Sequence, residues 1–248
     1  MRWWYNQRPM LQMLRQMAEV HRPDSLSSRL RTRRFALLRR LLVGLPRPLR
    51  ILDVGGTESF WRNLTAVGQG LGADTTIDLL NVGEVAASTT QGVIAHSGDA
   101  RHMPQFADQS FDVVFSNSVI EHVGELPDQR RMADEVRRVG RRYFVQTPCR
   151  TFPIEPHFLF PYFQFLPLEV QLFLVRHRRM GWFPRTPDPQ AALEVLRSVR
   201  LLTQDELRAV FPGATLLHER FFGLTKSLVA CGGFDELPLR PDDPFVRA

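Results

Sequence analysis

The sequence is poor in cysteine and lysine, and it lacks a long uninterrupted apolar run. Its two cysteines, Cys149 and Cys231, are too few and too far apart for a disulfide framework or a C-x-x-C metal site. Lys226 is the only lysine, so arginine carries almost all of the positive charge. The apolar stretch 158–168 contains two prolines and is too short to cross a bilayer, and the first residues lack the order of a signal peptide. We expect a cytoplasmic protein with no bound metal.

Positive charge is concentrated at the N-terminus. The formal net charge is +6, yet residues 1–50 contain twelve arginines against only Glu19 and Asp24. Apolar residues at three- and four-residue steps predict one helix around 10–20 and a second, arginine-rich helix over 27–42. We therefore predict a basic helical extension over residues 1–47. It can contact anionic lipid at the inner membrane, it can be a solvated face, or its apolar sides can cover the rest of the protein.

After this extension, strand and helix patterns alternate. Such alternation predicts an α/β fold in which helices connect the parallel strands of a doubly wound sheet. A segment rich in phenylalanine and proline, 151–167, interrupts the alternation, and a β-hairpin is predicted near the end. The predicted domain covers 48–235, with a tail over 236–248. Strands are expected at 50–54, 73–79, 92–97, 111–116, 141–147, 214–220 and 224–231, and helices at 58–68, 126–139, 168–179, 190–199 and 203–210.

Acidic residues follow three successive predicted strands. The first strand runs into Asp53-Val-Gly55-Gly56, where glycines permit a tight turn against which a ligand can lie. Asp78 closes the second run and Asp99, followed by Ala100, closes the third. Carboxyl ends of parallel strands meet at one edge of a sheet, so we expect one nucleotide-like ligand to lie across this edge.

The next segment points to a family. Asp108-Gln-Ser-Phe-Asp112-Val-Val leads into the fourth predicted strand, which ends at Asn117 and is followed by Glu121-His122. With the glycine turn and the acidic strand ends, this series resembles the class I S-adenosylmethionine-dependent methyltransferases that act on small molecules, the methyltransferase type 11 group. The resemblance implies a Rossmann-like, mostly parallel sheet of seven strands with an antiparallel last strand. It implies S-adenosylmethionine as the cofactor.

The resemblance also implies roles for individual residues. Asp78 would bind the ribose hydroxyls, although a solvated aspartate at the start of a loop is an alternative interpretation of this position. Asp99 and Ala100 would meet the adenine. The glycine turn departs from the family pattern, because Thr57 and Ser59 stand where glycines are usual. The residues implied to hold the cofactor are Asp53, Gly55, Gly56, Thr57, Asp78, Asp99, Ala100 and Asn117.

Methyl transfer by in-line displacement depends on alignment of the reacting atoms and exclusion of water, so it needs neither a metal nor a nucleophilic triad. An oxygen nucleophile still benefits from a base, and His157, which follows the fifth predicted strand, is our candidate. A hydrogen-bonded structural histidine is the alternative. Asn117 can hold the amino acid part of the cofactor or the nucleophile. We expect the 151–167 segment to cover the active site and to line a pocket for a small or lipid-linked acceptor.

Two other classes compete with this interpretation. A nicotinamide-dependent oxidoreductase is disfavoured, because Gly55-Gly56-Thr57-Glu58-Ser59-Phe60 lacks G-x-G-x-x-G and because the predicted fold ends in a hairpin. A non-catalytic module that uses this fold to bind a partner stays open, since the glycine pattern is incomplete. Nucleic acid is a disfavoured substrate, because the sequence contains no aromatic-basic platform and no base-flipping string.

Overall fold

A computed structural model describes residues 26–66, 70–84, 86–240, 243 and 245–247. The helix predicted around residues 10–20 and the aromatic residues near the N-terminus lie outside these ranges. Within them, the chain forms two compact units: a first unit of the described residues up to 37 with 150–199, and a second unit of the described residues from 38 to 149 and from 200 onward. No helix in these ranges is both long and apolar enough to cross a membrane. The predicted domain boundaries, 1–47, 48–235 and 236–248, remain predictions.

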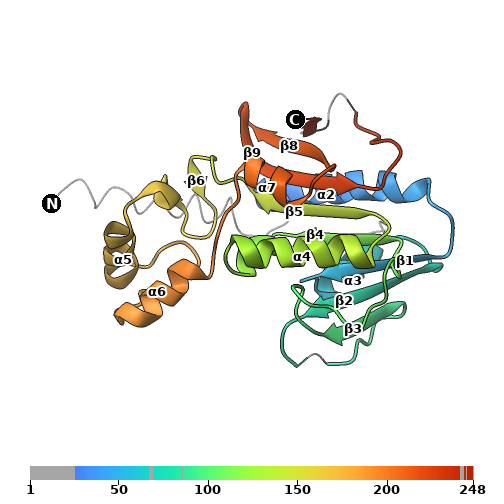
Figure 1. The fold of residues 1–248 in the computed structure, drawn as a ribbon, viewed down its shortest axis with the longest axis horizontal. Coiled ribbons are helices and arrows are strands. Elements are labelled where there is room, and N and C mark those ends of the chain that lie inside the picture. The colour runs from blue at the N-terminus through green and yellow to red at the C-terminus, as the bar shows by residue number, and fades with distance from the viewer. Residues whose placement is uncertain (1–25, 67–69, 85, 241–242, 244, 248) are drawn as a thin grey trace. The chain divides into compact units, whose positions relative to one another are not determined.

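The second unit is built on a sheet of eight strands in the order β10-β8-β9-β5-β4-β1-β2-β3 (Figure 1). Strands β1 to β5 are parallel, and β9, β8 and β10 are antiparallel to their neighbours. The strands are β1 (Leu49–Val54), β2 (Thr75–Asn81), β3 (Val93–Ser97), β4 (Val113–Asn117), β5 (Tyr143–Pro148), β8 (Thr215–Phe221), β9 (Leu224–Gly232) and β10 (Phe245–Arg247). The predicted α/β architecture with an antiparallel end is confirmed.

The predicted number of seven strands in the sheet is wrong by one. The eighth strand, β10, pairs antiparallel with β8 through Phe245 and Val246. Its segment had been predicted as a tail, because three residues after a proline-rich stretch show no alternating pattern. Phe245 is buried, so the contact removes an aromatic ring from water as well as pairing the backbone.

Apolar layers on both faces hold the sheet. On one face, α4 (Leu126–Val139) and α7 (Gln204–Val210) bury residues such as Met132, Val136 and Leu207 against the strands. Figure 1 shows α4 lying along the sheet. On the other face, α3 (Glu58–Ala66) places Trp61 edge-on to Phe115 of β4, with ring centroids 6.2 Å apart. The parallel strands β1, β2, β4 and β5 are therefore buried on both sides, whereas β3 at the edge is partly exposed.

The first unit contains the aromatic segment and the helices after it. Its elements are β6 (Ile154–Glu155), β7 (Phe160–Pro161), η3 (Phe163–Phe165), α5 (Leu168–His177) and α6 (Pro189–Arg197). The core includes Phe158 and Phe163, whose rings stack with centroids 4.2 Å apart, together with Val175 and Ala192. The arginine-rich helix predicted over 27–42 is α2 (Leu26–Val43), which begins in this unit and ends in the other.

Candidate functional site

The turn after β1 is shaped by two glycines. Gly55 has a φ of +75°, and a Cβ atom there would lie 2.4 Å from Val119 Cγ2, so a larger residue would not fit. Its N–H donates to the carbonyl of Leu80 at 2.8 Å, which ties the turn to the end of β2. A Cβ at Gly56 would lie 1.8 Å from Asp53 Oδ2. Both glycines are therefore required by the side chains of Val119 and Asp53, which pack against the turn.

Asp53 supports this turn from inside the protein. Its side chain is buried, and Oδ2 accepts a hydrogen bond of 2.8 Å from Trp61 Nε1 on α3. The carboxylate thus connects the end of β1, the glycine turn and α3. Thr57 lies in the same turn, where its hydroxyl contacts that of Ser59 at 3.3 Å. In the first turn of α3, the backbone N–H of Phe60 donates to the carbonyl of Thr57 at 3.1 Å.

Asp78 lies within β2, three residues before its end. The prediction that Asp78 stands at the end of the strand is therefore wrong. The apolar run continues through Leu79 and Leu80, so β2 ends at Asn81. Asp78 is fully buried, and Arg50 Nε and Nη2 donate to its two oxygens at 3.0 and 2.9 Å. His96 Nε2 lies 2.6 Å from Oδ1. Both oxygens of Asp78 are therefore occupied by neighbouring strands.

Asn81 takes the position at the end of β2. Its Nδ2 donates to the carbonyl oxygen of Gly56 at 2.9 Å. A carbonyl oxygen can only accept a hydrogen bond, so Nδ2 of Asn81 must be the atom that faces Gly56. The other atom of the amide, Oδ1, is a hydrogen-bond acceptor. The contact fixes the amide of Asn81 beside the glycine turn.

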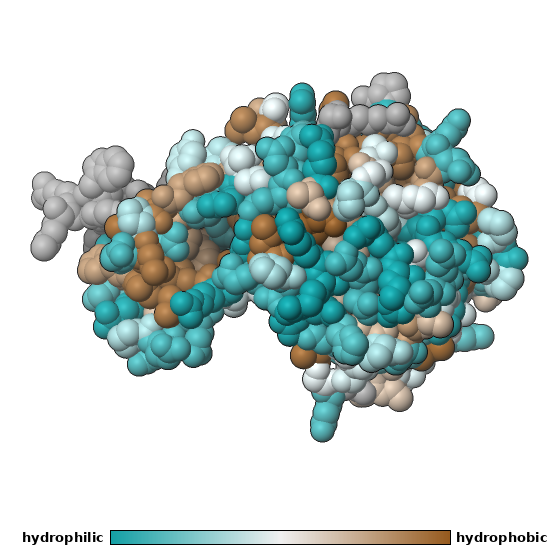
Figure 2. All heavy atoms as spheres, in the orientation of Figure 1, coloured by the Kyte–Doolittle hydropathy of each residue, from teal (hydrophilic) through white to brown (hydrophobic). Residues whose placement is uncertain are grey.

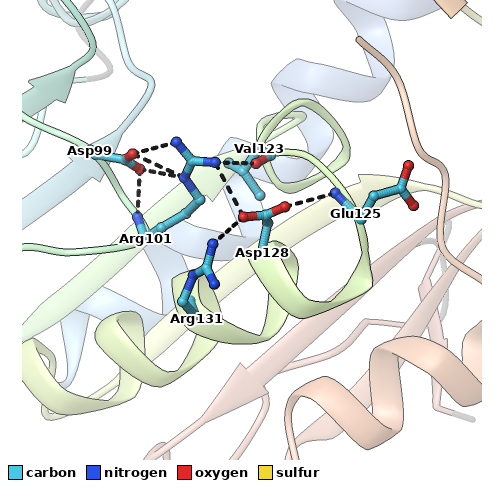
Figure 3. Close-up of polar contacts among 6 residues, drawn as sticks. All are labelled: Asp99, Arg101, Val123, Glu125, Asp128 and Arg131. Atoms are coloured by element: carbon cyan, nitrogen blue, oxygen red, sulfur yellow. Dashed lines mark hydrogen bonds and ion pairs between the residues drawn. The ribbon is translucent and has the colours of Figure 1, made fainter. Parts of the chain in front are cut away.

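The end of β3 is joined to α4 by a network of charges (Figure 3). Arg101 holds the Asp99 carboxylate with its backbone N–H, with Nε at 2.9 Å to both oxygens and with Nη2 at 2.6 Å. Its Nη1 reaches the carbonyl of Val123 and Asp128 Oδ1, both at 3.2 Å. The hydrogen bonds from Arg101 lower the pKa of Asp99 and raise the pKa of Arg101 itself. Asp99 is therefore held as a carboxylate in a fixed orientation.

These elements surround a cavity of about 350 Å³ at the carboxyl edge of the sheet. Its size falls within the range of small-molecule sites, about 300–1,000 Å³. Among the predicted cofactor residues, the cavity is lined by Gly55, Asp99 and Ala100, whereas Asp53, Gly56, Thr57, Asp78 and Asn117 are not among its lining residues. The other lining residues are Val54, Leu80, Asn81, Val82, Gly98, Arg101, Val119, His122, Val123 and Gly124.

Asn117 ends β4, the central strand beside β1. The next residue, Ser118, has a φ of +57°, and its hydroxyl donates to Gln146 Oε1 at 3.0 Å. The chain thus turns sharply where β4 ends. Val119, one residue further, packs on Gly55 and lines the cavity.

His157 lies in the first unit, in the loop between β6 and β7. Its Nδ1 lies 2.8 Å from Glu155 Oε1, and the backbone N–H of His157 donates to Glu155 Oε2 at 2.7 Å. Glu155 is buried and also accepts from the backbone N–H of Phe158. Since a carboxylate only accepts, Nδ1 carries the proton in this contact, and Nε2 is the basic nitrogen of the neutral ring.

The loop that carries His157 is fixed from its other side. Trp182 donates from its backbone N–H to the His157 carbonyl at 3.0 Å and from Nε1 to the Pro156 carbonyl at 3.1 Å. A Cβ at Gly181 would lie 2.1 Å from the same His157 oxygen. The imidazole is thus held by a carboxylate on a clamped loop.

Residues 52–143 match the family model described as a methyltransferase domain. This part of the chain is therefore a methyltransferase domain. The matched residues run from within β1 to the start of β5 and include every residue that lines the cavity.

Similarity to individual proteins is more distant. Two uncharacterized proteins of Mycobacterium tuberculosis, from strains CDC 1551 / Oshkosh and H37Rv, are each 38% identical to the chain over 76 residues, which is 30% of this chain. The matched segment spans 25% of the length of these curated relatives.

Two solved structures are similar to the chain at low sequence identity. A SAM-dependent methyltransferase from Aquifex aeolicus is 12% identical, with a TM-score of 0.45, and the match covers 80% of this chain and 87% of that one. A putative Zn-dependent alcohol dehydrogenase from Rhodobacter sphaeroides is 10% identical, with a TM-score of 0.47 and coverage of 77% and 86%. Likenesses of this degree do not distinguish one activity from another.

Two residues of the methyltransferase domain were missed by reasoning from the sequence, Asn81 and Arg101. Asn81 stands three positions after the aspartate that had been expected to end β2. Arg101 contacts Asp99 only two positions away, a pair that the local turn brings together. An arginine beside Gly-Asp-Ala was visible in the sequence, but it does not by itself indicate which carboxylate it binds.

Proposed function

We propose that the chain transfers a methyl group from S-adenosylmethionine to a small or lipid-linked acceptor by in-line displacement. The observation that carries this proposal is the cavity at the carboxyl edge of the sheet, where Gly55, Asn81 and Asp99 converge within the methyltransferase domain. S-Adenosylmethionine supplies an electrophilic methyl carbon: the acceptor's lone pair forms the new bond as the carbon–sulfur bond breaks, and S-adenosylhomocysteine leaves with that electron pair.

In this proposal, each of the three strand ends binds a different part of the cofactor. The turn at Gly55 lets the backbone approach the methionine part, and Asn81 Oδ1 accepts a hydrogen bond from a ribose hydroxyl. The fixed carboxylate of Asp99 and the backbone of Ala100 face the adenine. Asn81 replaces Asp78 in the ribose role, because Asp78 is already occupied by Arg50 and His96. Val82, which is 83% exposed and lines the cavity, offers an apolar surface to the adenine ring.

The residues for the acceptor come from the segment after β5. We propose that Nε2 of His157 removes the acceptor's proton, with Glu155 holding the ring and stabilising the imidazolium that forms. The contact of 2.8 Å between Glu155 and Nδ1 supports this role, since it leaves Nε2 as the basic atom. Asn117, at the end of β4, would position the nucleophile or the amino acid part of the cofactor.

The experiment that tests the activity uses methyl-labelled S-adenosylmethionine. The full chain is incubated with the labelled cofactor and a polar or lipid extract, and new labelled products are identified by mass spectrometry. Labelled product together with S-adenosylhomocysteine would support methyl transfer and would name the acceptor class. Binding of the cofactor without any labelled product across both extracts would support the non-catalytic module instead.

A further inference from the structure

The first unit exposes large apolar side chains over a short stretch of sequence, which we name the 162–182 surface. Among the described residues, the large apolar side chains of this stretch that are exposed are Tyr162, Phe165, Leu168, Val170, Phe173 and Trp182. Phe173 is 58% exposed and Phe165 is 52% exposed. Figure 2 shows apolar residues gathered over the region of α5. Exposed aromatic side chains at this density are typical of an interaction surface.

The arrangement along α5 explains why these side chains are not in the core. Leu174 and Val175 of the same helix are buried in the unit's aromatic core. Val170, Phe173 and His177 follow one another at three- and four-residue steps on the side turned away from Val175, and the His177 ring stacks on Phe173 with centroids 4.4 Å apart. The helix therefore has apolar side chains on both sides, and among the described residues the exposed side chains Val170 and Phe173 are outside the unit's core.

The charges beside this surface are positive. Arg176, Arg178, Arg179 and Arg185 lie within residues 168–185, where Glu169 is the only acidic residue. The acidic residues Asp188 and Glu194 belong to α6 and the turn before it. Aromatic side chains flanked by arginines suit the interface of an anionic bilayer, where rings enter the headgroup region and guanidinium groups meet phosphates.

We infer that the 162–182 surface binds the surface of an anionic membrane. Phe165, Phe173 and Trp182 enter the interface, and the arginines at the end of α5 meet the lipid phosphates. This contact is separate from the proposed methyl transfer, and it also differs from binding through the basic N-terminal extension. A lipid-linked acceptor would be within reach of a protein held in this way.

The test measures cosedimentation of the full chain with vesicles of phosphatidylglycerol and phosphatidylcholine, without cofactor or acceptor. The double variant Phe165→Ser/Phe173→Ser should bind at least about tenfold more weakly than the wild type, because two rings lose their burial in lipid. Phe222→Ser is the matched control, since Phe222 is 90% exposed in the turn between β8 and β9, and its binding should equal that of the wild type.

A second pair of variants tests the charges. Arg179→Gln/Arg185→Gln should weaken binding at low salt more than Arg137→Gln/Arg141→Gln, which removes the same net charge from the second unit. Circular dichroism and thermal unfolding check that every variant is folded. If the patch variants bind like their controls, the N-terminal extension or overall charge is responsible and the inference is wrong; absence of vesicle binding by the wild type would also overturn it.

Tryptophan fluorescence gives a readout that does not depend on destabilising changes. In the variant Trp3→Phe/Trp4→Phe, the remaining tryptophans are Trp61, which is 3% exposed, and Trp182, which is 43% exposed. Lipids brominated on their acyl chains should quench the emission of this variant when anionic vesicles bind. Vesicle binding with no quenching would place Trp182 outside the bilayer interface and would contradict the inference.

Discussion

Arg50 and Asp78 form a two-point ion pair across β1 and β2, with N–O distances of 3.0 and 2.9 Å. The guanidinium of Arg50 also lies 4.7 Å from the centroid of the Phe111 ring. Asp78 is fully buried, and its pairing with Arg50 and His96 satisfies a carboxylate that would otherwise be costly inside the sheet. The ion pair thus belongs to the interior of the sheet, and Asn81 is the residue that stands at the end of β2.

Replacing Asp78 is therefore expected to affect folding more than cofactor binding. Asp78→Ala should lower the free energy of unfolding by about 1–3 kcal/mol, because it leaves Arg50 and His96 without their shared acceptor. The half-exposed Arg50 can recover some hydration, which limits the loss. Urea unfolding measures the stability and calorimetry measures the affinity for S-adenosylmethionine. A large loss of affinity with unchanged stability would return the ribose role to Asp78.

Asn81→Ala should show the opposite behaviour. Loss of Oδ1 removes one acceptor for a ribose hydroxyl, so binding of S-adenosylmethionine should weaken by about 1–3 kcal/mol. Asn63→Ala is the matched control, because Asn63 is exposed on α3 and does not line the cavity. Calorimetry on both variants decides the point, and equal affinities for Asn81→Ala and the control would remove Asn81 from the site.

The pKa of Asp99 is expected to respond to Arg101. In the wild type the pKa of Asp99 lies below its usual value, and the largest cause is that the Arg101 side chain donates hydrogen bonds to the carboxylate. The stability that the carboxylate contributes is fully present above the pKa of an unfolded aspartate, about 3.9, and is lost as pH falls through the lower folded value. In the variant Arg101→Gln, the pKa of Asp99 in the folded protein should rise toward its value in the unfolded chain. The contribution of the Asp99 carboxylate to folding stability should therefore become smaller.

An NMR titration of the Asp99 carboxyl carbon measures this change directly. Arg131→Gln is the control, because Arg131 acts on Asp99 only through space and its removal should move the pKa less. If Arg101→Gln leaves the titration of Asp99 where it is in the wild type, the guanidinium does not hold this carboxylate in solution.

His157→Ala should lower the turnover number by about 10²-fold at saturating cofactor, with little change in cofactor affinity. Glu155→Gln should lower turnover less, by about tenfold, because the ring remains but its orientation and charge stabilisation weaken. His177→Ala, an exposed histidine on α5, is the control and should turn over normally on a soluble acceptor. Normal turnover by His157→Ala would give His157 a structural role only.

Much of the sheet could be predicted from the sequence, because apolar runs of strand length alternate with helical periods. The helix predicted over 126–139 is confirmed as α4, with the same ends. The strand β10 could not be predicted in this way, since its pairing with β8 depends on a contact distant in the sequence. The predicted position of Asp78 at the end of β2 was also wrong. Leu79 and Leu80 continue the strand beyond Asp78, so that Asn81 stands at the carboxyl end of β2.

The site was predictable where it depends on backbone shape, and less so where it depends on side-chain partners. Gly55, Asp99 and Ala100 line the cavity, as expected from the order of the strand ends. The partners of Asp78 come from β1 and β3, and no local pattern indicates that an arginine 28 positions away will occupy this carboxylate. Contacts between strands therefore decide which acidic residues remain available to a ligand.

The most direct test of the central claim is calorimetric titration of the full chain with S-adenosylmethionine, S-adenosylhomocysteine, NAD and NADP. We predict saturable binding of both adenosyl compounds at one shared site, with the affinity reduced in Asn81→Ala, and no binding of either nicotinamide nucleotide. Binding of NAD or NADP at this site, or the absence of S-adenosylmethionine binding by the folded protein, would contradict the account.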